Sequence, residues 1–179
     1  DSKLFPPRGT WEAGGYSPDA YGRWVNPSGQ RALPLIEGRC ITHFRLSSKG
    51  WVSGKGRRAV WRNINTTEDV FEPQYLVADS DYISRPTRLA GVRSSFMQVT
   101  STTNTRTMVS TLIPARWPCG ASVHLVSSYS GNLQCGLFLT GAFNSFVFDY
   151  QMRLKLGGNN VTHALMAEHC VPHYLETSS

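Results

Sequence analysis

Five cationic side chains lie close together in the stretch SSKGWVSGKGRRAVWRN, residues 47–63. They are Lys49, Lys55, Arg57, Arg58 and Arg62. Three glycines and two tryptophans are interspersed among them, and no acidic residue between Glu37 and Glu68 balances their charge. Glycine lets the backbone approach a ligand closely, and clustered cations neutralise phosphates. The pattern favours a loop that contacts phosphate; the alternative is a solvated hairpin with an ordinary basic tip.

A second polar stretch, STTNTRTMVSTLIP at residues 101–114, places Asn104 and Arg106 just before a β-like segment. Asparagine and arginine are the side chains that pair with adenine and guanine edges in the major groove. Two interpretations stay open from the residues alone. The stretch is either an ordinary polar turn or a recognition loop held by a rigid scaffold.

No catalytic or metal-binding pattern is present. The cysteine and histidines near the C-terminus lack the spacing of a zinc site; they are His163, His169, Cys170 and His173. The chain contains no phosphate-binding P-loop, Gly-x-Ser-x-Gly elbow or His-Glu-x-x-His helix. Its carboxylates are scattered and form no convincing acid/base pair. We therefore expect no catalytic residue, no metal ion and no cofactor in this chain.

The composition is that of one globular domain with a moderate basic excess. The chain has 179 residues, of which 40% are hydrophobic, and a formal net charge of +6. Such a charge suits a polyanionic partner without proving one. The four cysteines form no Cys-x-x-Cys pair, and no apolar run reaches the length of a membrane span, so we expect reduced thiols in a cytoplasmic protein. The chain begins with aspartate, and we expect it to be a piece of a larger protein.

Residues 1–33 are rich in glycine, proline and aromatic residues and show little periodicity. They predict an extended arm that packs on the domain or on another part of the larger protein, with turns at Gly14-Gly15 and at residues 27–29. Its aromatic side chains are predicted to be packing anchors, with base stacking as the alternative. They are Trp11, Tyr16, Tyr21 and Trp24.

Residues 34–179 are predicted to form a single α+β domain with mixed, mostly antiparallel strands. Alternation and β-branched residues predict strands at 39–45, 75–78, 95–100, 107–113 and 122–127. From residue 133 to 156, apolar residues recur at three- and four-residue steps, which predicts one long buried helix that Gly157-Gly158 ends. Its expected buried face consists of Leu139, Ala142, Phe143, Phe146, Tyr150 and Leu154. A polar loop and one short helix follow.

Several segments in order along residues 34–172 resemble one family. PLIEGRCITHF with GKGRRAVW, EPQYLV, VRSSFMQVTSTTNTRTMVSTLIP and NSFVFDYQMRLKLGGNNVTHALMAEHCVP are similar to segments of type IIG restriction–modification enzymes and related phage-defence N6-adenine DNA methyltransferases. In that family these segments belong to the target recognition domain, which is similar in fold to the recognition domains of type I specificity subunits. The resemblance implies the specificity part of a bacterial or archaeal enzyme, whose S-adenosylmethionine-dependent methyltransferase part, with or without a nuclease, lies elsewhere in the polypeptide.

The resemblance implies sequence-specific binding of duplex DNA, with the five clustered cations on phosphates. Arg106 matches an arginine that recurs among family members of different specificity, so bracing or a phosphate contact is favoured over base reading for Arg106 and Asn104. Sequence choice is expected in stretches that do not match the family, residues 79–93 and 127–134. The first of these adds three cations to the expected DNA-binding set, Arg85, Arg88 and Arg93.

Two other functions stay open. The chain is a non-catalytic binding module for another ligand, such as a carbohydrate, if the aromatic residues of segment 11–24 are exposed. Alternatively, the arm docks a partner domain of the same polypeptide, in which case its exposed aromatics mark an interface.

Overall fold

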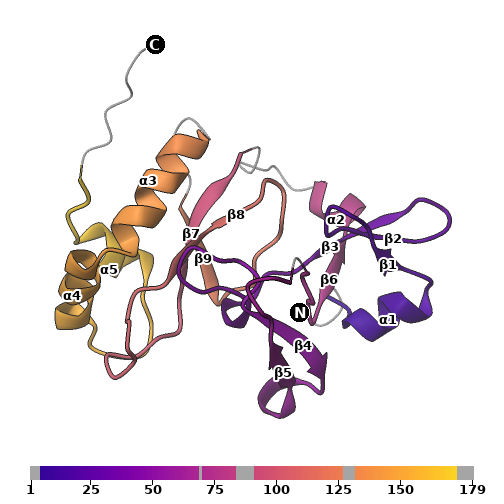
Figure 1. The fold of residues 1–179 in the computed structure, drawn as a ribbon, viewed down its shortest axis with the longest axis horizontal. Helices are drawn as coiled ribbons and strands as arrows, with labels where there is room; N and C mark the ends of the chain where they lie inside the picture. The colour runs from indigo at the N-terminus through magenta and orange to yellow at the C-terminus, as the bar shows by residue number, and fades with distance from the viewer. Residues whose placement is uncertain (1–4, 69, 84–90, 127–131, 173–179) are drawn as a thin grey trace.

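The computed structural model describes residues 5–68, 70–83, 91–126 and 132–172, and the fold is α+β. Figure 1 shows the C-terminal helices at one end of the molecule, a small antiparallel sheet at the other end, and a hairpin that projects from the middle. A three-stranded sheet lies between the helices and the hairpin. All the strand pairs in the three sheets are antiparallel.

The N-terminal segment belongs to a four-stranded sheet with the order β1-β2-β3-β6. Its elements are helix α1 (Arg8–Ala13) and strands β1 (Ser17–Pro18), β2 (Trp24–Val25), β3 (Arg31–Pro34) and β6 (Leu76–Ala78). The turns expected in the arm form, with Gly15 and Gly29 at positive φ, which glycine adopts without steric cost. Strand β6 confirms the strand predicted at 75–78, and helix α2 (Asp79–Ile83) follows it.

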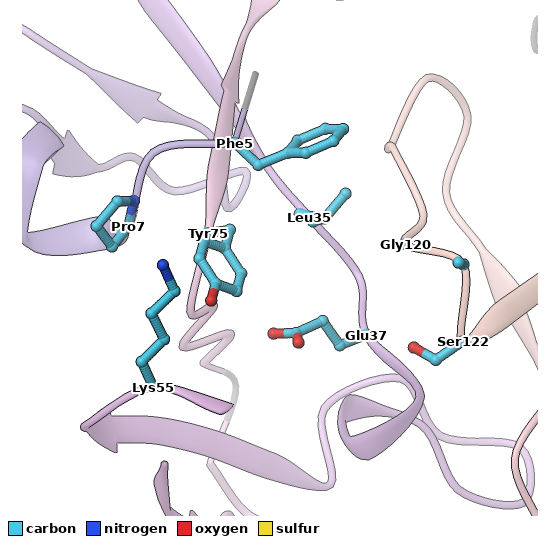
Figure 2. Close-up of a pocket in the computed structure, with 9 residues that line it drawn as sticks. Phe5, Pro7, Leu35, Glu37, Lys55, Tyr75, Gly120 and Ser122 are labelled. Atoms are coloured by element: carbon cyan, nitrogen blue, oxygen red, sulfur yellow. The ribbon is translucent and has the colours of Figure 1, made fainter. Parts of the chain in front are cut away.

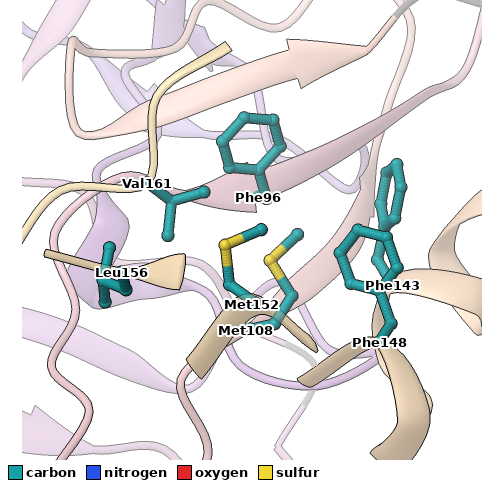
Figure 3. Close-up of a cluster of buried hydrophobic side chains, with 7 residues drawn as sticks. All are labelled: Phe96, Met108, Phe143, Phe148, Met152, Leu156 and Val161. Atoms are coloured by element: carbon teal, nitrogen blue, oxygen red, sulfur yellow. The ribbon is translucent and has the colours of Figure 1, made fainter. Parts of the chain in front are cut away.

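The central sheet has the order β8-β7-β9 and confirms three predicted strands with shifted ends. These are β7 (Arg93–Met97), β8 (Ser110–Ile113) and β9 (Val123–Val126). One face of this sheet packs against the C-terminal helices, and Figure 3 shows the side chains that meet there. The cluster consists of Phe96, Met108, Phe143, Phe148, Met152, Leu156 and Val161.

The prediction of one long helix from residue 133 to 156 is wrong, because two separate helices form in this segment. Helix α3 (Leu133–Phe143) is capped at its C-terminal end by Asn144, and helix α4 (Phe146–Lys155) begins after Ser145. The backbone of Ser145 is extended, and its Oγ caps α4 by accepting a hydrogen bond from Phe148 N at 3.1 Å. The backbone of Asn144 is still helical, since its N–H donates to Thr140 O at 3.1 Å, and its side chain pairs with strand β8. Its Oδ1 accepts from Ser110 N at 2.9 Å and its Nδ2 donates to Ser110 O at 2.8 Å.

This break changes which side of the segment is buried. Phe146, Tyr150 and Leu154, expected on the buried face, are 79%, 63% and 69% exposed, whereas Phe148 and Met152 are buried. Helix α4 does end at Lys155, but Leu156 is extended and neither following glycine adopts a positive φ. The short helix α5 (His163–Ala167) forms as predicted.

The prediction of a strand at residues 39–45 is also wrong. A single 3-10 turn, η1 (Gly38–Cys40), is followed by a tight turn in which Phe44 adopts a φ of 61°. Cys40 and Ile41 are adjacent and both buried in one cluster with Ile36, Ile113 and Val123. In a β-strand, neighbouring side chains point to opposite faces. Because Cys40 and Ile41 are both buried in the same cluster, residues 39–45 cannot form the predicted strand.

Two further properties concern the environment of the chain. None of the helices in the described part of the chain is long and apolar enough to cross a membrane. All four cysteines are free thiols. Burial raises the pKa of Cys40 and of Cys119 to about 12, which keeps both protonated at neutral pH.

Candidate nucleic-acid interface

The cation-rich stretch forms a two-stranded hairpin of β4 (Lys49–Ser53) and β5 (Val60–Asn63). The two tryptophans face each other across it, with Trp51 paired to Trp61, and a bulge follows Trp51. At the tip, a 3-10 turn, η2 (Gly56–Arg58), reverses the chain. Gly54 has a φ of +77°, and a side chain there would overlap the carbonyl of Arg58. The tip is therefore a compact turn that only glycine permits.

Three cations occupy this tip. Lys55, Arg57 and Arg58 are exposed, and no carboxylate in the described ranges forms an ion pair with any of them. Lys49 is also exposed, at the base of the hairpin. An unmatched positive charge on a projecting turn attracts anions from solution, because no carboxylate of the described residues is paired with it. The hairpin tip is the strongest candidate for a phosphate contact.

Two further arginines, which sequence reasoning did not select, flank the hairpin. The guanidinium of Arg8 lies 4.8 Å from the centre of the Trp51 ring, and its Nη1 donates to Trp51 O at 3.2 Å. The guanidinium of Arg39 lies 5.8 Å from the Trp61 ring and is exposed. Each packs on one of the two tryptophans. The spacing of tryptophan and glycine in residues 47–63 indicated the hairpin itself. It could not identify Arg8 and Arg39, because both lie outside that stretch and reach the tryptophans only through the fold.

Arg62 has a different role from the cations at the tip. Its Nε and Nη2 donate to the Glu72 carboxylate, both at 2.8 Å, and Nη2 donates to Glu68 at 2.9 Å. The hydrogen bonds from Glu72 and then Glu68 raise the pKa of Arg62 above its ordinary range. Trp51 N also donates to Glu72 O at 2.9 Å. The charge of Arg62 is already matched by the carboxylates of Glu68 and Glu72. Arg62 therefore joins the hairpin to the segment that carries Glu72 and is not available to contact DNA.

Arg93 is the clearest departure from the expected DNA-binding set. It is 2% exposed, and its Nη2 donates to Pro114 O at 2.9 Å and to Trp117 O at 2.8 Å. A side chain buried in this way supports the loop after β8 and does not reach a ligand at the surface. Arg85 and Arg88 lie outside the described residues, as do residues 84–90 and 127–131 of the two stretches expected to carry sequence choice.

Arg106 braces the loop between β7 and β8 against the helices. Its Nη2 donates to Asn144 O at 2.6 Å and to Ser145 O at 3.2 Å, at the junction of α3 and α4. Its guanidinium lies 4.5 Å from the Phe146 ring. This geometry supports the bracing role favoured for it from the sequence. Asn104 is exposed in the same loop, and its Nδ2 lies 3.4 Å from Thr100 Oγ1.

The same loop is held by a buried carboxylate on α4. Asp149 is 5% exposed, and its Oδ1 accepts from Thr107 N at 2.7 Å and from Met108 N at 2.6 Å. Its Oδ2 lies 3.4 Å from Arg106 Nε and 3.3 Å from Arg153 Nη2. Arg153 donates in turn to three loop carbonyls, those of Thr102, Asn104 and Thr105. Two of the segments that carry the family resemblance, STTNTRTM and NSFVFDYQMR, are therefore in direct contact.

The aromatic residues of the N-terminal segment do not form an exposed platform. Trp24 is 5% exposed, and the rings of Trp11 and Tyr16 pack edge to face with centroids 4.9 Å apart. Tyr21 is 76% exposed and lies against Arg23. One exposed ring is a poor basis for stacking against a sugar or a base, and this weakens the carbohydrate alternative.

The histidines do not assemble into a metal site within the described part of the chain. His163 lies beside His124, with ring centroids 4.3 Å apart. The pKa of His124 is lowered mainly by its burial and, to a smaller extent, by the positive charge of the nearby His163. His169 Nδ1 lies 2.8 Å from Leu165 O, and Cys170 is exposed. His173 lies outside the described residues.

No protein-family model matches the chain, and neither a curated protein nor a solved structure matches it.

Proposed function

We propose that this chain binds duplex DNA as the target recognition part of an adenine-specific DNA methyltransferase of the type IIG restriction–modification or phage-defence kind. The observation that carries the proposal is the projecting hairpin tip, where Lys55, Arg57 and Arg58 are exposed and unmatched by carboxylates in the described residues. The resemblance of several ordered segments supports the same function. Methyl transfer would use S-adenosylmethionine bound by a separate part of the same cytoplasmic polypeptide.

In this proposal the hairpin supplies affinity and the braced loop supplies geometry. Phosphate contacts fix the register of a protein on the duplex but carry no sequence information. The loop that carries Asn104 is fixed to α4 through Arg153, which makes it a rigid edge next to the DNA. Such rigidity is what a methyltransferase needs, since it has to hold the duplex while one base leaves the stack.

The salt dependence of duplex binding tests the proposal. Affinity for a mixed-sequence duplex is measured by fluorescence anisotropy at increasing potassium chloride concentration. Each phosphate contact contributes about 0.9 to the slope of log affinity against log salt concentration. The double variant Arg57→Gln/Arg58→Gln is expected to bind more weakly and to reduce that slope by about 2.

A matched control removes the same charge elsewhere. Arg31 lies on β3 and Arg116 follows β8, and both are exposed. The double variant Arg31→Gln/Arg116→Gln is expected to keep the slope. Salt-independent binding by the unaltered chain, or equal losses in the two double variants, would contradict the proposal.

A further inference from the structure

A pocket of about 400 Å³ opens beside the hairpin tip, between segments that are far apart in the sequence. Phe5, Leu35 and Tyr75 form part of its wall, and the charged side chains among the described residues that line it are Glu37 and Lys55. Figure 2 shows these two on opposite sides of the pocket, with the Tyr75 ring between them in this view. Lys55 also belongs to the hairpin tip, so one cation of the candidate phosphate contact shares a pocket with a carboxyl group.

The carboxyl group of Glu37 has an unused acceptor in this pocket. Its Oε2 is buried, and no described residue donates a hydrogen bond to it. The neighbouring Gly38 N donates to Ser122 Oγ instead, at 2.9 Å. Burial raises the pKa of the Glu37 carboxyl, and the charge of Arg39 offsets only part of that rise. A buried polar atom without a partner is costly, and native proteins rarely retain one without a use.

Lys55 is the side chain of the pocket that can supply the missing hydrogen bond. It forms no ion pair with a carboxylate of the described ranges. Its ammonium carries three donors on a flexible four-carbon stem, and neither Arg57 nor Arg58 of the same tip lines the pocket. A carboxyl oxygen accepts from an ammonium whether the carboxyl is ionised or neutral. The choice of Lys55 is therefore the same for both protonation states of Glu37.

We propose that Glu37 is a positioning residue for Lys55: its carboxyl accepts a hydrogen bond from the Lys55 ammonium inside the pocket, and a DNA phosphate competes with it for that ammonium. The inference rests on the proposed function, because the competition requires a phosphate at the hairpin tip. Arg57 and Arg58 are free to contact the duplex from the start, whereas Lys55 has to leave the pocket first. Pairing in the free protein lowers the apparent affinity, since only chains with Lys55 released gain its phosphate contact.

The titration of Glu37 tests the pairing without DNA. Carboxyl ¹³C NMR measures the pKa of Glu37 in the unaltered chain and in Lys55→Gln. A paired cation stabilises the ionised carboxyl, so its removal is expected to raise that pKa further and to strengthen proton binding about two- to fivefold, the range of a partly exposed ion pair. Arg57→Gln removes the same charge from the same tip outside the pocket, and it is expected to change the pKa far less.

Duplex affinity tests the competition. Glu37→Gln is expected to bind a mixed-sequence duplex about two- to fivefold more tightly than the unaltered chain in fluorescence anisotropy, because an amide holds the ammonium less firmly than a carboxylate does. In a Lys55→Gln background the same change is expected to bring little or no gain, since the group it releases is absent. Thermal unfolding verifies that each variant is folded.

A second carboxylate beside the hairpin controls for the loss of negative charge as such. Glu12 pairs with Arg8, which packs on Trp51, and it does not line the pocket. Any gain in duplex affinity from Glu12→Gln is expected to be the same with and without Lys55. A carboxylate that acts only through the general field of the protein behaves in this way, whereas a direct competitor for one ammonium does not.

The outcomes separate the two proposals. An unchanged Glu37 pKa in Lys55→Gln, or a gain from Glu37→Gln that is equal in both backgrounds, would overturn the inference while leaving duplex binding intact. A pKa that rises in Tyr75→Phe but not in Lys55→Gln would assign the buried oxygen to the tyrosine hydroxyl, and would also overturn it. Failure of the unaltered chain and of every variant to bind the duplex would overturn the proposed function, and the competition with it.

Discussion

Arg106 and Asp149 meet at the junction between the β7–β8 loop and helix α4, with Nε of the arginine 3.4 Å from Oδ2 of the carboxylate. The arginine is 18% exposed at its side chain and the aspartate 7%. The other carboxylate oxygen accepts from two backbone N–H groups of the loop. A polar loop next to a strand therefore depends for its shape on one carboxylate of a helix that lies much later in the chain.

Removal of this carboxylate is expected to be strongly destabilising. Asp149→Ala leaves the N–H groups of Thr107 and Met108 without their acceptor and leaves the partly buried Arg106 without its counter-charge. Loss of one partner of a buried pair costs about 3–5 kcal/mol of unfolding free energy. Urea unfolding followed by circular dichroism measures it. The exposed pair of Glu168 with Lys155 provides the control, since Glu168→Gln is expected to cost less than about 1 kcal/mol. Equal effects would refute the bracing role.

Asn144 is expected to be as important as a core residue, although it is polar. Its amide forms two hydrogen bonds with the backbone of Ser110, and it is 6% exposed. Asn144→Ala removes the partner of the buried N–H of Ser110 and one partner of its C=O. The loss is expected to lower the unfolding free energy by about 1–3 kcal/mol, the cost typical of such buried groups. The same change at exposed Asn159 is the reference, and chemical denaturation compares the two. A cost at residue 144 no larger than that at 159 would show that the side-chain pairing contributes nothing.

Arg62 is expected to affect stability more than DNA affinity. Arg62→Gln removes the hydrogen bonds to Glu68 and Glu72 that join the hairpin to the following segment. Because these side chains are partly exposed, the unfolding free energy is expected to fall by less than it does in Asp149→Ala. The salt slope of duplex binding is expected to stay that of the unaltered chain at temperatures where the variant is folded. A reduced slope with unchanged stability would instead place Arg62 on phosphate.

Glu37 is expected to make the fold less stable as the pH rises. Burial raises the pKa of its carboxyl above the ordinary value, so the folded chain holds this proton more tightly than the unfolded chain. The stability that protonation contributes is fully present below the unfolded value and is lost as the pH rises through the folded value. Glu37→Gln is therefore expected to raise the unfolding free energy at pH 8 more than at pH 5. A larger gain at pH 5 would contradict the assigned direction.

The sequence predicts local structure well where the pattern and the packing agree. Strands β6, β8 and β9 form close to where alternation and β-branched residues place them. Periodicity predicts the helical segment from residue 133 but not its break, where Ser145 is extended and the Asn144 side chain pairs with a strand that lies far away in the chain. Helical propensity contains no information about such a partner.

The candidate site shows the same division. The cations of the hairpin tip were predicted as a cluster, and the structure brings Lys55, Arg57 and Arg58 together on one exposed turn. The burial of Arg93 and the ion pairs of Arg62 could not be predicted, because both depend on carbonyls and carboxylates brought near by the fold. The pocket around Glu37 was missed for the same reason, since its walls come from segments that are far apart in the sequence.

The pairing of Asn144 with Ser110 has one more consequence. Strand β8 lies at the edge of its sheet, and Phe44 N donates to the same Ser110 carbonyl at 3.0 Å. An open edge is a template on which another molecule can add a strand, which is a common route to aggregation. Here the hydrogen-bonding groups of Ser110, at the start of that edge, are already occupied from within the chain, so the sheet is closed to growth by intermolecular strand addition at this point.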